Sequence, residues 1–368
     1  MALQMDQYLK DLEYIINIDS GSSDIEGNDR MAEFFFRAFE EAGFDSEIRR
    51  AGEKNRPVVI AKTPEAGEFE FYLGGHMDTV FPKGTAAKRP FHIREGCAFG
   101  PGTVDMKAGA LLILYIAREL RKTSPEIPLC IVLNSDEELG SVDSADILRE
   151  QAARCRRAFI FEGGRKGGKL VNERKGIAKF RIEIQGMASH SGTAPRRGAS
   201  AVVELAHWIV QLDKLKNYNK GTTINVGLME GGTALNMVAP HSKALMEVRY
   251  VQPQEFKRVE RAIEKLAENP YVEGTQAEVR KLSHYPPVIP TDRTRALMKD
   301  LEKYNLEYVK AGGTSDANRL ADLGIPIIDG CGPLGGFPHS EDEFLDIETV
   351  QQRFDLFCAI IRDIGGRK

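Results

Sequence analysis

The chain has 368 residues, of which 42% are hydrophobic and 28% are charged. These proportions exclude a disordered, collagen-like or coiled-coil protein, and the length favours two domains over one. Lys and Arg number 50 against 54 Asp and Glu, and the net charge of −4 gives no electrostatic basis for binding nucleic acid or an anionic membrane.

Residues 1–174 alternate between helical and strand patterns. Helical periodicity covers 5–18 and 28–42, and two short apolar runs follow at 57–62 and 69–73. The later elements are, in order, a helix from Asp105 to near Arg121, an apolar run over Ile127–Leu133, a helix over 143–153 and a short strand at Ala158–Phe161. This alternation is typical of an α/β domain in which helices cover both faces of a mostly parallel sheet.

A different pattern begins near Lys175. Its elements are, in order, a strand at 175–185, a helix at 198–216, the consecutive strands TTINVGLM and KALMEVRYV, a helix at 253–268 and a strand at 276–282. The order β-α-β-β-α-β predicts a ferredoxin-like unit, which is one sheet with two helices on one face.

The α/β pattern returns after the proline-rich segment HYPPVIPTD, which we interpret as a connector. Helices are expected at 293–304, 315–323 and 348–364, with the strand IPIID between the last two. We therefore predict one α/β domain of residues 1–174 and 284–368, and an inserted domain of residues 175–283 that moves against it as a hinged pair.

Cysteine usage and the chain ends favour a cytoplasmic protein. The five cysteines are widely spaced and include no CxxC pair, which suits free thiols in a reducing compartment. The N-terminal segment carries charges among its apolar positions, so it predicts an amphipathic helix and no leader peptide. No apolar run reaches the ~20 residues of a membrane span.

Side chains that commonly bind metals follow four of the predicted strands or turns. They are His76 and Asp78 in LGGHMDTVF, Asp105 in GPGTVDMKAGA, the pair Glu137 and Glu138 in LNSDEELGS, and Glu162 in FIFEGG, and the later loop GGFPHSEDEF adds His339. Parallel sheets place their ligands at the carboxyl ends of the strands, so we expect these side chains to meet at one edge of the sheet.

Each of these positions alone has a simpler explanation. Asp105 could cap a helix, the glutamate pair could complement a helix dipole, and a lone loop histidine could simply be solvated. Taken together, two histidines and three carboxylates are the ligand types of a dinuclear, zinc-type hydrolytic site.

These segments, together with ASHSGTAP and GGTSDA, resemble the dizinc exopeptidases and amidohydrolases. That family includes glutamate carboxypeptidases, aminoacylases, succinyl-diaminopimelate desuccinylase and acetylornithine deacetylase. The resemblance covers nearly the whole chain, and Glu162, where other branches carry Asp, makes it closest to the glutamate carboxypeptidase branch. It implies two divalent metal ions, zinc first and cobalt or manganese as alternatives. By the same resemblance Asp105 bridges both ions, His76 and Glu162 complete one site, and Glu138 and His339 complete the other.

The resemblance also implies roles outside the ligand set. Glu137 would be the general base, Asp78 would orient His76, and His190 would stabilise the oxyanion. Substrate contacts are implied for Arg249, Asn236, Gly313 and Thr314, and residues 175–283 would form the lid and the dimerisation surface of a homodimer. A solvated loop histidine and an ordinary strand arginine remain the alternatives for His190 and Arg249.

The function implied is hydrolysis of the amide bond of a C-terminal or N-acylated amino acid, of carboxypeptidase or aminoacylase type and with glutamate release as one option. The partner would be a small peptide or N-acyl amino acid. A dipeptidase, tripeptidase or deacylase of the same family is the alternative. A binding protein that has lost the chemistry is the other class, and the presence of Glu137 argues against it, because a binder needs no general base.

Two glycine-rich segments imitate nucleotide-binding motifs. GGRKGGK at 163–169 has the spacing of a phosphate-binding loop, but Leu170 stands where a Ser or Thr is required. GCGPLG at 330–335 fits the dinucleotide-binding spacing, but Pro333 prevents a helix from beginning there. We interpret the first as part of a hinge and the second as shaping the approach to His339.

Overall fold

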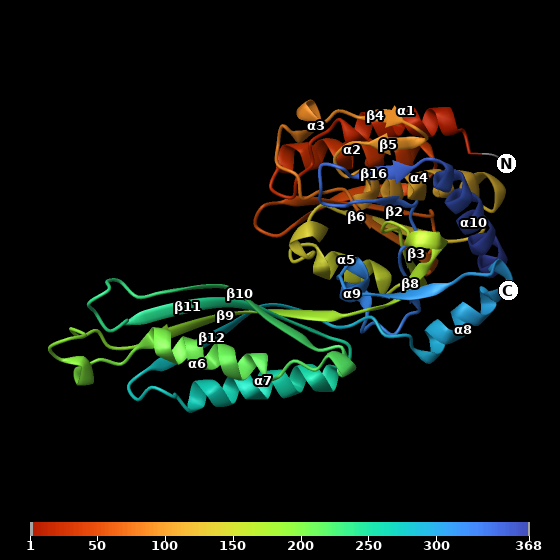
Figure 1. Cartoon of the computed structure of the whole chain (residues 1–368). Helices are drawn as coiled ribbons and strands as arrows, with labels where there is room; N and C mark the ends of the chain where they lie inside the picture. Colours follow the sequence, from red (N-terminus) through yellow and green to blue (C-terminus); the bar gives the residue numbers. More distant parts are fainter. Residues whose placement is uncertain (1–2, 367–368) are drawn as a thin grey trace. The chain divides into compact units, whose positions relative to one another are not determined.

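The computed structural model describes residues 3–366, and the chain divides into two compact units (Figure 1). The α/β unit comprises the residues up to Glu173 and those from Val288 onward, and the inserted unit comprises Arg174–Pro287.

The α/β unit is built on a six-stranded sheet of order β1-β2-β6-β3-β7-β14. Its strands are β1 (Asp45–Ala51), β2 (Arg56–Lys62), β3 (Phe69–His76), β6 (Leu129–Asn134), β7 (Cys155–Ile160) and β14 (Ile327–Ile328). Strands β6, β3, β7 and β14 run parallel, whereas β1 and β2 extend the sheet antiparallel at one edge. The predicted α/β domain with a mostly parallel sheet is confirmed.

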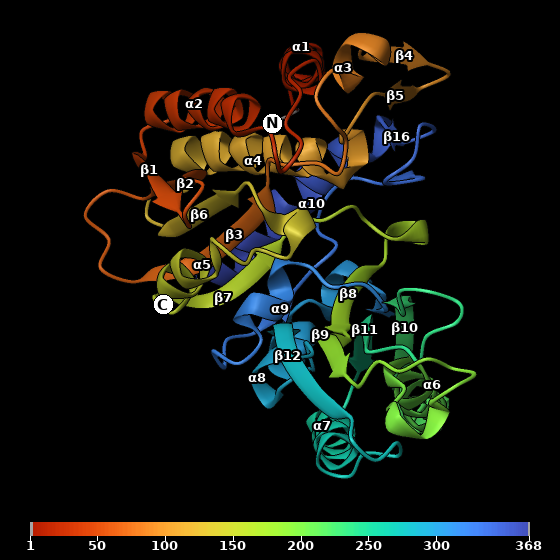
Figure 2. The same ribbon diagram turned by 90° about the vertical axis from the view of Figure 1, so that its left-hand side faces the viewer.

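Helices cover both faces of this sheet, as Figure 2 shows for α4 and α5. One face packs against α1 (Met5–Ile16), α2 (Ile25–Glu41), α4 (Ala108–Thr123) and α10 (Glu348–Gly365), and the other against α5 (Ala145–Ala152) and α9 (Asp316–Leu320). Along β2, Val59 and Ala61 enter the first core, and Val58 and Ile60 enter the second. Because successive side chains of a strand point to opposite faces, a strand buried on both sides is a continuous apolar run.

Several short strands of the α/β unit were not predicted. A small four-stranded sheet joins β15 (Gly335–Gly336), β16 (Phe344–Asp346), β5 (Cys97–Phe99) and β4 (His92–Arg94), and β8 (Leu170–Arg174) pairs with β13 (Tyr308–Ala311). Residues 163–169 lead into β8 and not into a helix, which removes the phosphate-loop interpretation. The helices α3 (Thr85–Lys88) and α8 (Asp292–Asp300) complete the unit.

The inserted unit is a four-stranded antiparallel sheet with two helices on one face. The strands are β9 (Gly176–Gln185), β10 (Thr223–Gly231), β11 (His241–Tyr250) and β12 (Gln276–Tyr285), in the order β10-β11-β9-β12. The helices are α6 (Ala201–Asp213) and α7 (Pro253–Glu268). Alternate residues of β9, such as Phe180 and Ile182, pack with Trp208 and Val259 from these helices. The element order is that of a ferredoxin-like unit.

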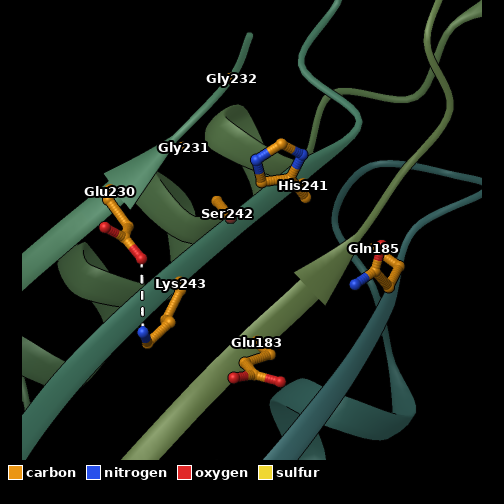
Figure 3. A pocket seen from close by; sticks show the side chains of 8 residues that line it. All are labelled: Glu183, Gln185, Glu230, Gly231, Gly232, His241, Ser242 and Lys243. Atoms are coloured by element: carbon orange, nitrogen blue, oxygen red, sulfur yellow. Dashed lines mark hydrogen bonds and ion pairs between the residues drawn. The ribbon is translucent and has the colours of Figure 1, made fainter.

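The face of this sheet away from the helices carries charged residues of β9 and β11, among them Lys179, Glu183 and Lys243. A groove of about 750 Å³ lies near one end of this face, where Lys243 pairs with Glu230 at 3.3 Å, and the side chains that line it are drawn in Figure 3. Glu183, Gln185 and His241 line the same groove.

Within residues 3–366, no helix is both long enough and apolar enough to cross a membrane.

Candidate metal centre

The candidate ligands lie where the parallel strands of the α/β unit end. His76 is the last residue of β3, the turn Glu137–Leu139 follows β6, and Glu162 follows β7. Asp105 lies in the turn Thr103–Lys107 ahead of α4, and His339 lies in the loop before β16. The sheet therefore gathers side chains that are up to 263 positions apart, from His76 to His339, at one edge.

Asp105 occupies the centre of the group. Its Oδ1 lies 3.4 Å from His76 Nε2, and its Oδ2 lies 3.1 Å from His339 Nε2. His339 Nε2 is also 3.2 Å from Glu138 Oε2. One carboxylate thus presents a separate oxygen to each histidine, which is the arrangement that a shared ligand between two cations requires.

The remaining acids close the group around His76. Its Nε2 lies 3.8 Å from Glu162 Oε1 and 4.0 Å from Glu137 Oε2. Ligand atoms of His76, Asp105 and Glu138 lie within 4.8 Å of one another, and so do those of His76, Glu137 and Glu162. All five predicted metal ligands, together with Glu137, therefore lie in one cluster.

The donor atoms of this cluster fit divalent cations. His76 Nε2 and Glu138 Oε1 are buried and have no hydrogen-bond partner. Buried polar atoms are nearly always satisfied, so such orphans call for an unseen partner. Imidazole nitrogens and carboxylate oxygens are ligands that suit zinc, cobalt and manganese.

Asp78 contacts both His76 and the turn that carries Glu137 and Glu138, and so holds these two parts of the cluster in place. Its carboxylate accepts the backbone N–H of Glu137 at 3.1 Å and that of Glu138 at 3.2 Å. His76 Nδ1 lies 2.9 Å from the backbone oxygen of Asp78 and 3.3 Å from its Oδ1. A carbonyl oxygen can only accept, so Nδ1 carries the proton and the lone pair of Nε2 faces the cluster.

The charge balance of the cluster also favours cations. Hydrogen bonds with Asp105 and Glu138 raise the pKa of His339 to about 10. Burial opposes protonation of His76, but the neighbouring carboxylates of Asp105, Asp78 and Glu162 outweigh it and raise its pKa well above the usual value. Burial raises the pKa of Glu137, and the neighbouring Glu162 adds to the shift. Negative charge thus exceeds what the protein's own cations neutralise, and metal ions binding here would displace protons.

Three buried polar residues that support the cluster were not predicted. Ser22 donates its hydroxyl to Asp78 Oδ2 at 2.6 Å, and Asn134 Nδ2 donates to the two carboxylate oxygens of Asp316 at 3.0 and 2.9 Å. Glu343 accepts backbone N–H groups of the turn that carries Asp105. The segments GGTSDA and PHSEDEF had been noted, but nothing in the sequence separates Glu343 from its exposed neighbours at 341 and 342.

In the inserted unit, His190 and Asn236 come together. His190 is exposed in the loop after β9, and Ser191 donates its N–H to the backbone oxygen of Asn236 at 3.0 Å. His190 Nδ1 accepts the backbone N–H groups of Gly192 at 3.1 Å and Thr193 at 3.2 Å. Nε2 therefore carries the proton in the neutral ring and can act as a donor.

Arg249 lies at the other end of the same sheet. Arg249 of β11 pairs with Ile177, near the start of β9. His190 follows the other end of β9, whose last residue is Gln185. Eight residues of extended strand span ~26 Å. Arg249 also donates from Nε to Glu247 Oε1 at 2.8 Å. The inserted unit thus does not bring Arg249 together with His190 and Asn236.

Gly313 and Thr314 lie in the α/β unit, between β13 and α9. The segment continues into Asp316, which contacts Asn134 at the end of β6. The implied substrate contacts Gly313 and Thr314 therefore lie next to the carboxyl end of the sheet, ahead of the short helix α9, which has five residues.

Comparison with known proteins gives consistent matches. The chain matches the description Peptidase family M20/M25/M40 over residues 72–363. Carboxypeptidase G2 from Pseudomonas sp. (strain RS-16) is 28% identical, covering 98% of this chain and 90% of the relative. Acetylornithine deacetylase from Myxococcus xanthus is 26% identical, covering 89% of this chain and 90% of the relative.

Solved structures give the same fold. A tripeptidase from Staphylococcus aureus superposes with a TM-score of 0.82 at 21% identity, covering 100% of both chains. The M20 family metallo-carboxypeptidase Sso-CP2 from Sulfolobus solfataricus superposes with a TM-score of 0.75 at 18% identity, covering 98% of this chain and 100% of the other.

Proposed function

The chain belongs to peptidase family M20/M25/M40, whose enzymes are metal-dependent hydrolases of peptide and related amide bonds, and on that basis we propose that it releases a C-terminal or N-acylated amino acid. The substrate class proposed is a small peptide or an N-acyl amino acid with a free carboxylate, with glutamate as one option. The observation that carries the proposal is the position of Asp105, whose two oxygens face the two histidines separately.

The proposal assigns the dinuclear site to His76, Asp105, Glu138, Glu162 and His339, with Asp105 shared. When bound, two divalent cations, zinc in the first instance, would lower the pKa of a water and polarise the scissile carbonyl. The unpartnered His76 Nε2 and Glu138 Oε1 support this assignment. Asp78 would hold His76 and the glutamate pair in place throughout.

Glu137 is the general base in this proposal. Its carboxyl group is largely buried, and burial raises its pKa above the usual value for a glutamate. A base of higher pKa takes a proton from water more readily and can return it to the leaving nitrogen. Glu138, its neighbour, is oriented towards His339 and so serves a different role.

The inserted unit is proposed as a lid that supplies His190 and Asn236. The protonated Nε2 of His190 would donate to the oxyanion of the tetrahedral intermediate. Arg249 is the side chain of this unit that could pair with the substrate carboxylate, but its Nε and Nη2 already bind Glu247, so this role would require that pair to open.

We expect loss of activity on chelation and a strong preference for free carboxylates. The test uses a panel of dipeptides and N-acyl amino acids, each with its C-terminally amidated counterpart. The free acids should be hydrolysed when zinc, manganese or cobalt is present and should not be hydrolysed after treatment with a chelator. A hydrogen bond to a charged group contributes about 1.5–3 kcal/mol, so the amidated compounds should react at least ~10-fold more slowly.

The outcomes separate the alternatives. Equal cleavage of amidated and free-acid substrates would overturn carboxylate recognition and favour an aminopeptidase. A requirement for a free N-terminus would favour the dipeptidase or tripeptidase alternative. Metal binding without hydrolysis of any panel member would favour a binding protein.

We also propose a homodimer formed through the inserted unit. Strand β10 is an edge strand, and its Leu228 and Met229 are exposed, as are Val203 and Val210 of the adjacent α6. An edge with exposed apolar neighbours is suited to pairing across a two-fold axis. Light scattering should give twice the chain mass of 40.9 kDa, and Val210→Lys combined with Leu228→Lys should shift the protein to monomer. A wild-type monomer at assay concentration would contradict this proposal.

A further inference from the structure

Glu343 is a fully buried acid that the proposed chemistry does not use. Its side chain is 0% exposed, and the two acids before it in the chain are exposed. A buried carboxylate is tolerated only where donors surround it. Its donors are all backbone N–H groups of one distant turn.

Both carboxylate oxygens of Glu343 are occupied. Oε2 accepts the N–H of Gly102 at 2.9 Å, and Oε1 accepts the N–H of Val104 at 2.9 Å and of Asp105 at 3.0 Å. Successive N–H groups that converge on one anion form a backbone nest, and here the anion is a side chain of the protein itself.

The turn at residues 102–105, which Glu343 binds, has a conformation that its own sequence does not determine. Gly102 has a φ of +76°, and a Cβ at that position would lie 2.5 Å from Thr79 Cγ2. Asp105 has φ −123° and ψ 89°, so it is extended and not helical, although α4 begins three residues later. The turn therefore depends on tertiary contacts for its conformation.

We propose that Glu343 is a positioning residue that fixes the Asp105 carboxylate against His339, an inference that rests on the proposed metal site. The two contacts come from one short segment. His339 approaches the side chain of Asp105 with 3.1 Å between Nε2 and Oδ2, and Glu343, four residues on, binds the backbone N–H of the same aspartate. The spacing of the shared ligand from its histidine is thereby set by the 339–343 loop.

The test compares Glu343→Gln with Glu341→Gln, an exposed glutamate of the same loop. Glutamine has the size of glutamate but turns an NH₂ group towards at least one of the three N–H donors. Loss of an outer partner of a metal ligand commonly reduces metal affinity 10–100-fold. We expect Glu343→Gln to weaken zinc binding by about 10–100-fold in competition with a chromogenic chelator, and Glu341→Gln to leave it unchanged.

Two further readouts separate positioning from a general structural role. At saturating metal, kcat of Glu343→Gln should fall while KM stays within ~2-fold of wild type, because the substrate contacts are elsewhere. The visible absorption bands of the cobalt-loaded protein, which report ligand geometry, should change in Glu343→Gln and not in Glu341→Gln. Glu343→Asp keeps the charge but is shorter by one methylene, so its zinc affinity should lie between those of wild type and Glu343→Gln.

A lowered melting temperature with unchanged zinc affinity and an unchanged cobalt spectrum would overturn the proposal. If Glu343→Gln does not fold, as judged by circular dichroism, Glu343→Asp provides the same three measurements, and wild-type values in all of them would overturn it equally. Failure of the wild-type protein to bind zinc or cobalt would instead refute the proposed metal site and hence the proposed function.

Discussion

Replacing Glu137 by Ala should leave the metals bound and reduce kcat by about 10²–10⁴-fold, the contribution typical of a general base. The Glu137 backbone N–H, which binds Asp78, survives the substitution, so the turn that presents Glu138 should keep its shape. His76, Asp105 and His339 keep the contacts that bring their ligand atoms together.

Metal content by mass spectrometry and kcat on a free-acid substrate check this prediction together. Glu138→Ala is the matched control, because it removes the adjacent carboxylate that faces His339 and should lose metal as well as activity. Equal depletion of metal in the two variants would contradict the division of labour within the pair.

Replacing Asp105 by Ala should, in contrast to Glu137→Ala, remove the metal ions, and activity should be lost as a consequence. Each of its oxygens faces one histidine, so the substitution removes a ligand from both proposed ion sites at once. We expect affinity to fall by more than the ~100-fold that bounds outer-partner effects. Residual kcat should depend on the concentration of added zinc.

Zinc titration of the metal-free protein measures this effect. Asp342→Ala, an exposed acid in the His339 loop, is the control and should bind as wild type does. Wild-type stoichiometry and affinity in Asp105→Ala would show that the aspartate is not shared between two ions.

The sequence predicted the α/β architecture because its central strands and helices are long and strongly patterned. The run at β2 is apolar at successive positions because both faces of the strand are buried. Strand β1 was missed, because it is an edge strand whose charged residues, such as Glu47 and Arg49, face solvent and conceal the alternation. Strands of two or three residues, such as β15 and β16, are too short to show any period.

The residues of the candidate site also fall into those that could be predicted from the sequence and those that could not. His76, Glu137, Glu138 and Glu162 follow predicted strands, so their convergence could be expected from the topology of a parallel sheet. Glu343 could not be found, because a side chain satisfied by backbone N–H groups leaves no complementary residue type in the sequence. The contact between Arg249 and Glu247 could not be predicted from the sequence either, because two charged residues that are two positions apart on a strand can bind each other or can bind separate partners.

The inserted unit begins and ends at neighbouring points of its own sheet, since Ile177 near the start of β9 pairs with Tyr285 at the end of β12. The folded insert therefore separates the two parts of the α/β unit by no more chain entropy than a short hairpin would. Glu343 lies 241 positions from Gly102, and nearly half of that separation is cancelled once the insert has folded and joined its ends. Such modularity makes the insert exchangeable, because an extension or replacement beyond the paired ends adds little loop entropy to the assembly of the metal centre.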